Sequence, residues 1–339
     1  MRGLRTSAAG LGCLFALAIT GCSGQGGAAD APSAAPTAAP TSASSSAGPA
    51  YAPYVSATSA SENDSAGSPT TYNLAFVISS GSGCTPRWNG TRELGDASVA
   101  DRIAELTADG AAVRVSFGGA SGKELAAVCD SASELAAAYG EALDAAGTGK
   151  ADFDVEGDEL TDAGSVALRS EAIALLQRER EDLEVSFTLP VMPSGLDDDG
   201  VALLRSANDH GVQVSTVNLM TMNYGESYTG DMGAYALRSA RAAHTQLKEV
   251  FGQSDAATWR GMALTSMIGV NDVDGETFTL ADAAEVRAFA EEKDIAWVSM
   301  WSAFRDRRCE DEDAGADDAS TDCSGVEQSA GAFAEAFSG

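Results

Sequence analysis

The sequence predicts an α/β fold, a single-domain (β/α)8 TIM barrel, and three observations support it. Short runs of β-branched and aromatic residues alternate with Ala- and Glu-rich helical stretches along the body of the chain. Eight such strand runs occur, which is the number that closes a barrel of this class. No GxGxxG turn follows the first run, which disfavours the alternative of a doubly wound open sheet.

The expected elements follow one another in strand–helix order. Strands are expected at residues 51–57, 72–78, 112–117, 151–156, 184–190, 214–222, 261–267 and 295–301. Helices are expected at residues 97–109, 132–146, 162–180, 197–210, 232–251 and 280–293. Residues 58–71 are polar and poor in helix formers, so the first helix of the barrel is expected to be reduced to a loop.

The amino-terminal part of the chain predicts export. Residues 1–22 combine a short basic region with an apolar stretch that is too short to span a membrane. The end of this segment, Ile19-Thr20-Gly21-Cys22, resembles the bacterial lipobox, which implies cleavage before Cys22 and lipidation of its thiol. Ordinary cleavage nearby with a free Cys22 is the alternative. Residues 23–50, rich in Ser, Ala and Pro, are expected to be a flexible linker to a domain at 51–339.

These features predict an exported lipoprotein at the bacterial cell surface, or one released from it, that contacts the membrane only through its lipid anchor. The charge supports this limited contact with the membrane. The chain has 21 Lys and Arg against 50 Asp and Glu, a net charge of −29, which excludes nucleic acid and anionic membrane surfaces as partners. Only two histidines occur, His210 and His244, so a His-rich metal site is excluded. We expect a monomer without cofactor or metal.

Four of the six cysteines lie outside the predicted signal peptide and anchor. An even number in an exported protein favours disulfides. Of three possible pairings, Cys84–Cys129 with Cys309–Cys323 is the simplest, because each pair flanks a local segment. A four-cysteine zinc site is the alternative, but the close Cys-x-x-Cys spacing is absent. The acidic stretch between Cys309 and Cys323 is expected to be a solvated loop, since its oxygens lack EF-hand calcium spacing.

The fourth expected strand carries the strongest chemical signal. Asp152, Asp154 and Glu156 alternate with Phe153 and Val155, so a strand places the three acids on one face. The apolar pair suits the helix-facing side, which sends the acids into the barrel. Neighbouring buried carboxyls repel, so at least one pKa is expected to rise, as a general acid near neutral pH requires. An exposed edge strand is the alternative, but a closed barrel has no free edge.

A retaining glycosidase of the usual kind needs a second carboxylate across the site. The seventh expected strand, 261–267, ends without Asp or Glu, and Asp272 in the following loop is the nearby candidate. The absence of a strand-borne nucleophile favours one supplied by the substrate, such as an acetamido oxygen.

Two motifs carry a resemblance to a known family. Ser116-Phe117-Gly118-Gly119 at the third strand and Asp152 to Glu156 at the fourth resemble the two signature motifs of family 18 glycoside hydrolases, the chitinases. Met220-Thr221-Met222-Asn223-Tyr224-Gly225, Trp301 and Tyr51-Ala52-Pro53-Tyr54 fit as well. The resemblance covers about residues 51–309 and is greatest to a bacterial branch with a Met-Thr-Met-Asp-Tyr-Gly sixth strand.

This resemblance implies substrate-assisted hydrolysis of β-1,4-linked N-acetylglucosamine through an oxazolinium intermediate, with retention. Glu156 would protonate the glycosidic oxygen, and Asp154 would hold the acetamido group. Asp152 would share a proton with Asp154 and accept a hydrogen bond from Ser116. The implied substrate-binding residues are Ser116, Met220, Met222, Asn223, Tyr224, Trp301 as the pocket floor, and Tyr54 and Phe76, for which core packing is an equal alternative.

Three positions depart from the family pattern. Gly149 replaces an Asp that is often structural, Met222 replaces a hydrogen-bonding Tyr, and Asn223 replaces an Asp. Met222 cannot donate and Asn223 carries no charge, so electrostatic support for the oxazolinium is expected to be weaker. Tyr224 is the candidate for the missing hydroxyl.

The expected function is that of a chitinase acting on chitin and chito-oligosaccharides, with soluble or amorphous substrates preferred. One alternative is an endo-β-N-acetylglucosaminidase acting on N-glycans, because the same residues would serve. Another is a non-catalytic carbohydrate-binding lipoprotein, against which the presence of Glu156 argues.

Overall fold

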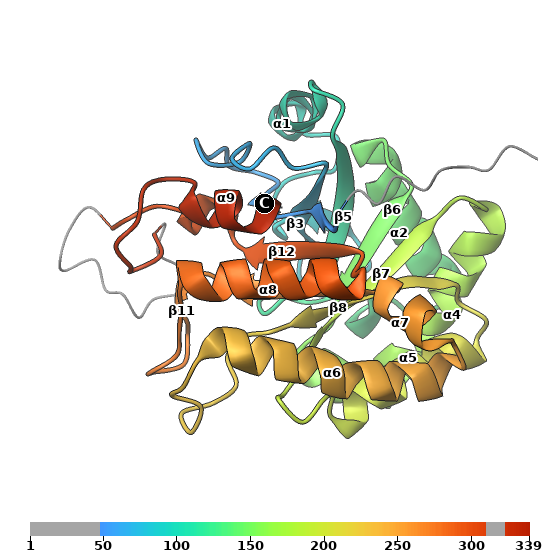
Figure 1. Cartoon of the computed structure of the whole chain (residues 1–339). Coiled ribbons are helices and arrows are strands. Elements are labelled where there is room, and N and C mark those ends of the chain that lie inside the picture. The colour runs from blue at the N-terminus through green and yellow to red at the C-terminus, as the bar shows by residue number, and fades with distance from the viewer. Residues whose placement is uncertain (1–47, 310–322) are drawn as a thin grey trace, which may run out of the picture. The chain divides into compact units, whose positions relative to one another are not determined.

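The computed structural model describes residues 48–309 and 323–339, which form a curled sheet of parallel strands surrounded by helices (Figure 1). The strands are hydrogen-bonded in the order β1-β12-β9-β8-β7-β6-β5-β3-β2. Their bounds are β1 Ala50–Tyr51, β2 Tyr54–Ser56, β3 Thr71–Ser79, β5 Ala112–Gly118, β6 Lys150–Asp154, β7 Glu184–Pro190, β8 Val214–Met220, β9 Met262–Met267 and β12 Trp297–Trp301.

The two ends of this order are halves of one strand. β1 pairs with β12 and β2 pairs with β3, and only Ala52-Pro53 separates them. These two residues also bridge both neighbours, because the Ala52 N–H donates to Val298 at 3.0 Å and the Pro53 carbonyl accepts from Asn73 at 2.9 Å. The nine strands therefore make eight staves of a closed barrel, which confirms the predicted fold and excludes an open sheet.

All eight expected strands are present, with shifted ends. The fourth stops at Asp154 and the sixth at Met220, so Glu156 and Met222 lie just beyond their strands. β1 begins at Ala50, the last residue of the predicted linker. Three short strands were not expected: β4 (Pro86–Trp88), which pairs with β3, and the pair β10 (Gly269–Val270) and β11 (Thr277–Phe278). The predicted signal peptide, with Cys22, and most of the linker lie outside the described residues.

The six expected helices are also present. They are α1 (Ala97–Thr107), α2 (Ala132–Ala146), α4 (Ala163–Glu179), α5 (Asp198–Asp209), α6 (Met232–Phe251) and α8 (Leu280–Lys293). Short helices α3 (Gly157–Thr161), α7 (Asp255–Arg260) and α9 (Ala332–Ser338) are additional. Side chains that accept from the first-turn N–H groups, such as Ser131 at α2 and Asp197 at α5, begin most of them. Within the described ranges, no helix has the length and apolarity needed to cross a membrane.

An apolar layer fills the space between the strands and the helices. Phe153 of β6 stacks on Phe117 of β5 at 5.3 Å and meets Tyr139 of α2 edge-on at 4.9 Å between ring centroids. Phe187 of β7 continues the row. The apolar residues of β6 thus face the helices, as predicted, and alternation turns Asp152 and Asp154 into the barrel.

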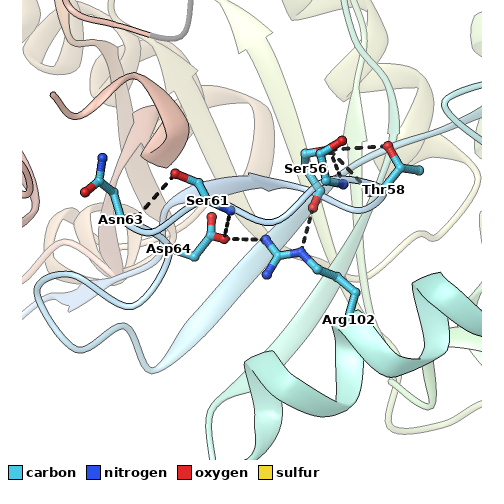
Figure 2. Close-up of polar contacts among 7 residues, drawn as sticks. Ser56, Thr58, Ser61, Asn63, Asp64 and Arg102 are labelled. Carbon is cyan, nitrogen blue, oxygen red and sulfur yellow. Dashed lines mark hydrogen bonds and ion pairs between the residues drawn. The ribbon is translucent and has the colours of Figure 1, made fainter.

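Residues 57–70 form a helix-free connection between β2 and β3, as expected. Arg102 of α1 holds this connection (Figure 2), since it donates to Asp64 at 2.7 Å and to the Ser56 carbonyl at 3.3 Å. The Asp64 carboxylate also accepts from the Ser61 N–H. Arg102 and Asp64 are both buried, so this ion pair anchors the loop in place of a helix.

The predicted disulfides are confirmed as Cys84–Cys129 and Cys309–Cys323. Cys84–Cys129 ties the turn between β3 and β4 to the segment before α2, and both segments follow strands at their carboxyl ends. The acidic stretch 310–322 lies outside the described residues.

Replacing Cys84 and Cys129 by Ser together is expected to lower the free energy of unfolding by roughly 4 kcal/mol, because the bond closes a loop of 45 residues. Urea unfolding under non-reducing conditions measures the change. The double Ser variant of Cys309 and Cys323 serves as the comparison. The Cys309–Cys323 bond closes a loop of only 14 residues, so its removal is expected to lower the free energy of unfolding by less. A larger loss in the second variant would contradict this account.

Candidate active site

Asp152 is the most deeply buried acid of the row and has a complete set of hydrogen bonds. The Ser116 and Tyr54 hydroxyls donate to Oδ2 at 2.7 and 2.9 Å. The Ser186 and Thr188 hydroxyls donate to Oδ1 at 2.7 and 2.8 Å. The expected hydrogen bond from Ser116 is therefore present, and four hydroxyls from β2, β5 and β7 satisfy the carboxylate.

A second layer of polar side chains orients these donors. The Asn218 amide of β8 donates to the Thr188 hydroxyl at 3.0 Å, and the Thr265 hydroxyl of β9 donates to the Asn218 carbonyl oxygen at 2.8 Å. Sequence reasoning missed Thr188, Asn218 and Thr265. Their signal was present as polar residues among the buried positions of these three strands.

Asp154 and Glu156 differ from Asp152 in their surroundings. Burial, followed by the charges of Glu156 and Asp152, raises the pKa of Asp154 well above its ordinary value, which favours the protonated form of this carboxyl beside Glu156. Its Oδ1 atom is buried without a partner. Burial is also the main cause that raises the pKa of Glu156 to about 7, with a contribution from the charge of Asp272. The predicted rise in pKa is therefore found at two acids of the row.

The acids face a pocket of about 400 Å³ at the carboxyl ends of the strands. Its aromatic wall consists of Trp301, which stacks on Phe76 at 5.6 Å, and Tyr54, which meets Trp301 edge-on at 5.9 Å. The rest of the lining includes Met220, Met222, Asn223 and Thr265. Of the residues predicted to bind substrate, Tyr54, Phe76, Met220, Met222, Asn223 and Trp301 thus line one pocket, and Ser116 lies beneath it through Asp152.

Asn223 is tied to the hairpin that joins β10 and β11. Its amide donates to the Asp272 carboxylate at 3.1 Å, and its carbonyl oxygen accepts from the Asp272 N–H at 3.1 Å. Buried Glu276 fixes the other end of the contact, because it accepts from the Gly225 N–H at 2.8 Å. Asp272 therefore contributes a carboxylate beside position 223, where the family has one and this chain has Asn. Asp272 also lines the pocket.

Tyr224 was expected to supply a hydroxyl to the site, and this prediction is wrong. Its ring packs with Tyr228 and Tyr235, and its hydroxyl accepts from Ser239 of α6 at 3.4 Å. The reason is the backbone at Asn223, whose φ of +53° lies in the left-handed region and turns the following residue outward.

The paired glycines after β5 let the chain pass close to the acids. A Cβ on Gly118 would lie 2.1 Å from the Asp154 carbonyl oxygen, and one on Gly119 would lie 2.8 Å from the Phe76 ring. Both residues have φ near +90°. In contrast, a Cβ on Gly149 would meet only the Asp182 carbonyl, at 3.6 Å, and Gly149 precedes β6 at the end of the barrel away from the acids.

The pocket opens into a hollow on each side. Beyond Phe76 and Trp301 lies one of about 750 Å³, also lined by residues 59–63 and Asn89. Beyond Asp154 and Glu156 lies one of about 430 Å³, which includes Asp158 and Glu159 of α3. Because each hollow shares these residues with the pocket, the three form one cleft across the barrel mouth. In the described ranges, no group of three His, Cys, Asp or Glu side chains could hold a metal ion.

Two curated proteins are similar to this chain. A probable bifunctional chitinase/lysozyme of Escherichia coli strain K12 is 34% identical over 275 residues, which are 76% of this chain and 31% of that protein. Endochitinase 11 of Metarhizium anisopliae is 33% identical over 275 residues, which are 76% of this chain and 52% of that protein. The chain thus spans about a third to a half of the length of these relatives. No protein-family model matches the sequence.

Solved structures extend the comparison over almost a whole domain. The catalytic domain of a hyperthermophilic chitinase from Pyrococcus furiosus is 30% identical, with a TM-score of 0.73 over 85% of this chain and 93% of that one. Catalytic-site mutants of active domain 2 of a thermostable chitinase from Pyrococcus furiosus, in complex with chito-oligosaccharides, give a TM-score of 0.74 at 30% identity, over 85% of this chain and 92% of that one. With its row of acids at the mouth of a matching barrel, the chain is a glycoside hydrolase that belongs to family 18, the chitinases.

Proposed function

We propose that the protein hydrolyses β-1,4-N-acetylglucosamine linkages in chitin and chito-oligosaccharides, and that the substrate's own acetamido oxygen is the nucleophile. The observation that carries this proposal is the inward row of Asp152, Asp154 and Glu156 beside the Trp301 wall. The chitinases to which the chain is similar support the choice of substrate.

Glu156 is the general acid. A pKa of about 7 keeps much of it protonated near neutral pH, and it stands where the pocket meets the hollow lined by α3. It protonates the glycosidic oxygen, so the leaving sugar occupies that hollow. The sugar that is attacked occupies the pocket, with its apolar face on Trp301. The rest of the glycan continues past Phe76 into the neighbouring hollow.

Asp154 holds the acetamido group. Its unpartnered Oδ1 is free to accept from the acetamido N–H, which turns the carbonyl oxygen towards the anomeric carbon. The resulting oxazolinium carries positive charge, which nearby carboxylates stabilise. Water then opens the ring with Glu156 as the base, and the anomeric configuration is retained.

The acids around the pocket favour this route over a protein nucleophile. Besides Asp154 and Glu156, the acid among the described lining residues is Asp272, on a hairpin and solvent-exposed. Asp272 is hydrogen-bonded to Asn223 through both its backbone N–H and its carboxylate. These two hydrogen bonds hold it at the rim of the pocket. A conventional nucleophile is instead held rigidly beneath the anomeric carbon.

Glu156→Gln is expected to lower kcat on a fluorogenic chitobioside by about 10²- to 10⁴-fold, because the amide cannot protonate the leaving oxygen. Glu171→Gln is the matched control, since Glu171 is exposed on α4 and lines neither the pocket nor the hollows beside it, and it is expected to retain activity. Equal losses in the two variants would contradict the role of Glu156. A wild-type enzyme that cleaves N-glycan cores and no chito-oligosaccharide would instead identify an endo-β-N-acetylglucosaminidase.

Asp272→Asn is expected to move the basic limb of the pH–rate profile to lower pH by about half a unit. The Asp272 charge raises the pKa of Glu156, so its removal lets Glu156 lose its proton at lower pH. Asp274→Asn, on the same hairpin and outside the pocket lining, is the control and should leave the limb in place. A basic limb that moves up, or that moves equally in both variants, would refute this assignment.

We also propose that the protein is a lipoprotein anchored through Cys22. The Ile19-Thr20-Gly21-Cys22 sequence after a short apolar segment supports this. In a bacterial host, Cys22→Ser is expected to abolish incorporation of a labelled fatty acid and release the enzyme from the membrane fraction. Cys13→Ser, within the signal segment, is the control and should be labelled normally. Labelling that persists without Cys22 would rule out this anchor.

A further inference from the structure

The β10–β11 hairpin carries part of the pocket lining, although its two strands form a sheet separate from that of the barrel. Asp272, between these strands, lines the pocket and is hydrogen-bonded to Asn223 through both its N–H and its carboxylate. The positions of these two side chains in the pocket therefore depend on what holds the hairpin against the barrel.

Arg305 is a buried side chain that holds the first strand of the hairpin. Its two Nη atoms donate to the carbonyl oxygens of Ile268 and Val270 at 2.9 and 2.8 Å, and only 1% of its surface is exposed. The two carbonyls lie on either side of Gly269 in the chain, so the guanidinium spans the point where β9 ends and β10 begins. A planar guanidinium presents its donors as a rigid fork, so the two hydrogen bonds fix both the position and the direction of β10.

The carboxyl-terminal segment fixes the same strand. The Val270 N–H donates to the Ser324 carbonyl at 2.8 Å, and Ser324 directly follows the Cys309–Cys323 disulfide. A Cβ on Gly269 would lie 1.9 Å from the same carbonyl oxygen. Val270 is therefore held at both its N–H and its carbonyl by residues outside the hairpin.

Arg305 also belongs to the segment that continues from the aromatic wall of the pocket, since it follows Trp301 closely in the chain. The Ile268 N–H donates to the Trp301 carbonyl at 3.1 Å, and Phe304, next to Arg305, meets the Trp301 ring edge-on at 6.0 Å. Arg305 thus joins the end of the strand that carries Trp301 to the hairpin that carries Asp272.

We propose that Arg305 is a positioning residue for substrate binding, which holds the β10–β11 hairpin at the end of β12 and so fixes the Asn223–Asp272 pair relative to Trp301. The proposal rests on the proposed function, because it takes this pocket as the site of the sugar that is attacked. Arg305 is not among the residues that line the pocket, so it acts on the sugar through the hairpin. A pocket whose lining is already in place binds its ligand without first having to order it.

The kinetic test replaces Arg305 by Met, which keeps an unbranched side chain and removes both donors. On the fluorogenic chitobioside, Arg305→Met is expected to raise KM about 5- to 10-fold and to change kcat by less than about twofold, because substrate and transition state lose the same contacts. Arg305→Lys keeps the charge but replaces the fork by a single nitrogen, so its KM is expected to lie between those of the wild type and the Met variant.

Arg180→Met is the control for loss of an arginine elsewhere in the barrel. Arg180 follows α4 and donates to the Asp144 carboxylate at 2.7 Å, at the end of the barrel where β7 begins. This variant is expected to lower the melting temperature and to leave KM unchanged. An unchanged KM in Arg305→Met, an equal rise in Arg180→Met, or a loss confined to kcat would overturn the proposal.

Amide hydrogen exchange tests the same contacts without substrate. Arg305→Met is expected to speed exchange in residues 268–276, while residues 184–190 of β7 keep their wild-type rates as an internal reference. Wild-type exchange in 268–276 would overturn the positioning role, whereas faster exchange in an enzyme without glycosidase activity would refute only the proposed function. If Arg305→Met does not fold, Arg305→Lys decides: faster exchange in this segment supports the proposal, and wild-type exchange overturns it.

Discussion

The alternation of β6 is the constraint on which the site depends. Phe153 must face the helices to complete the stacked row with Phe117 and Phe187, so Asp152 and Asp154 have no direction left but inward. A closed barrel keeps water away from its interior, and an unsatisfied carboxylate there is costly. The neighbouring strands therefore carry hydroxyls at the inward positions next to β6.

Depth in the barrel then separates three acids of the same chemistry. The deepest, Asp152, accepts hydrogen bonds from four hydroxyls. Asp154 lacks such a set of donors, and burial raises its pKa well above the ordinary value, whereas Glu156 lies at the mouth with a pKa raised to about 7. The row thus runs from a fully hydrogen-bonded, buried carboxyl to an acid at the pocket over five residues of one strand and its extension. A single strand position could not supply this gradient.

Much of this was readable from the sequence, because period-two and helical patterns report burial directly. The eight strands and the inward acids are of this kind, whereas both disulfides followed from the number and spacing of the cysteines. Thr188 and Thr265 were not found, because a lone hydroxyl in a strand does not reveal which neighbour it reaches. Tyr224 was misplaced because a left-handed residue before it breaks the alternation on which its direction was based. The contact of Asp272 with Asn223 spans 49 positions, which no local pattern encodes.

The helix-free connection between β2 and β3 forms a wall of the largest hollow in the cleft, yet its buried anchor is a contact to α1. Its tip, residues 59–62, contributes no side chain to the apolar core of the barrel. Changes of length or composition at the tip would therefore cost little stability, because loop-closure entropy grows only slowly with length. This arrangement makes the glycan-binding end of the cleft evolvable: new specificities can arise at the rim while the buried acids and their donors stay untouched.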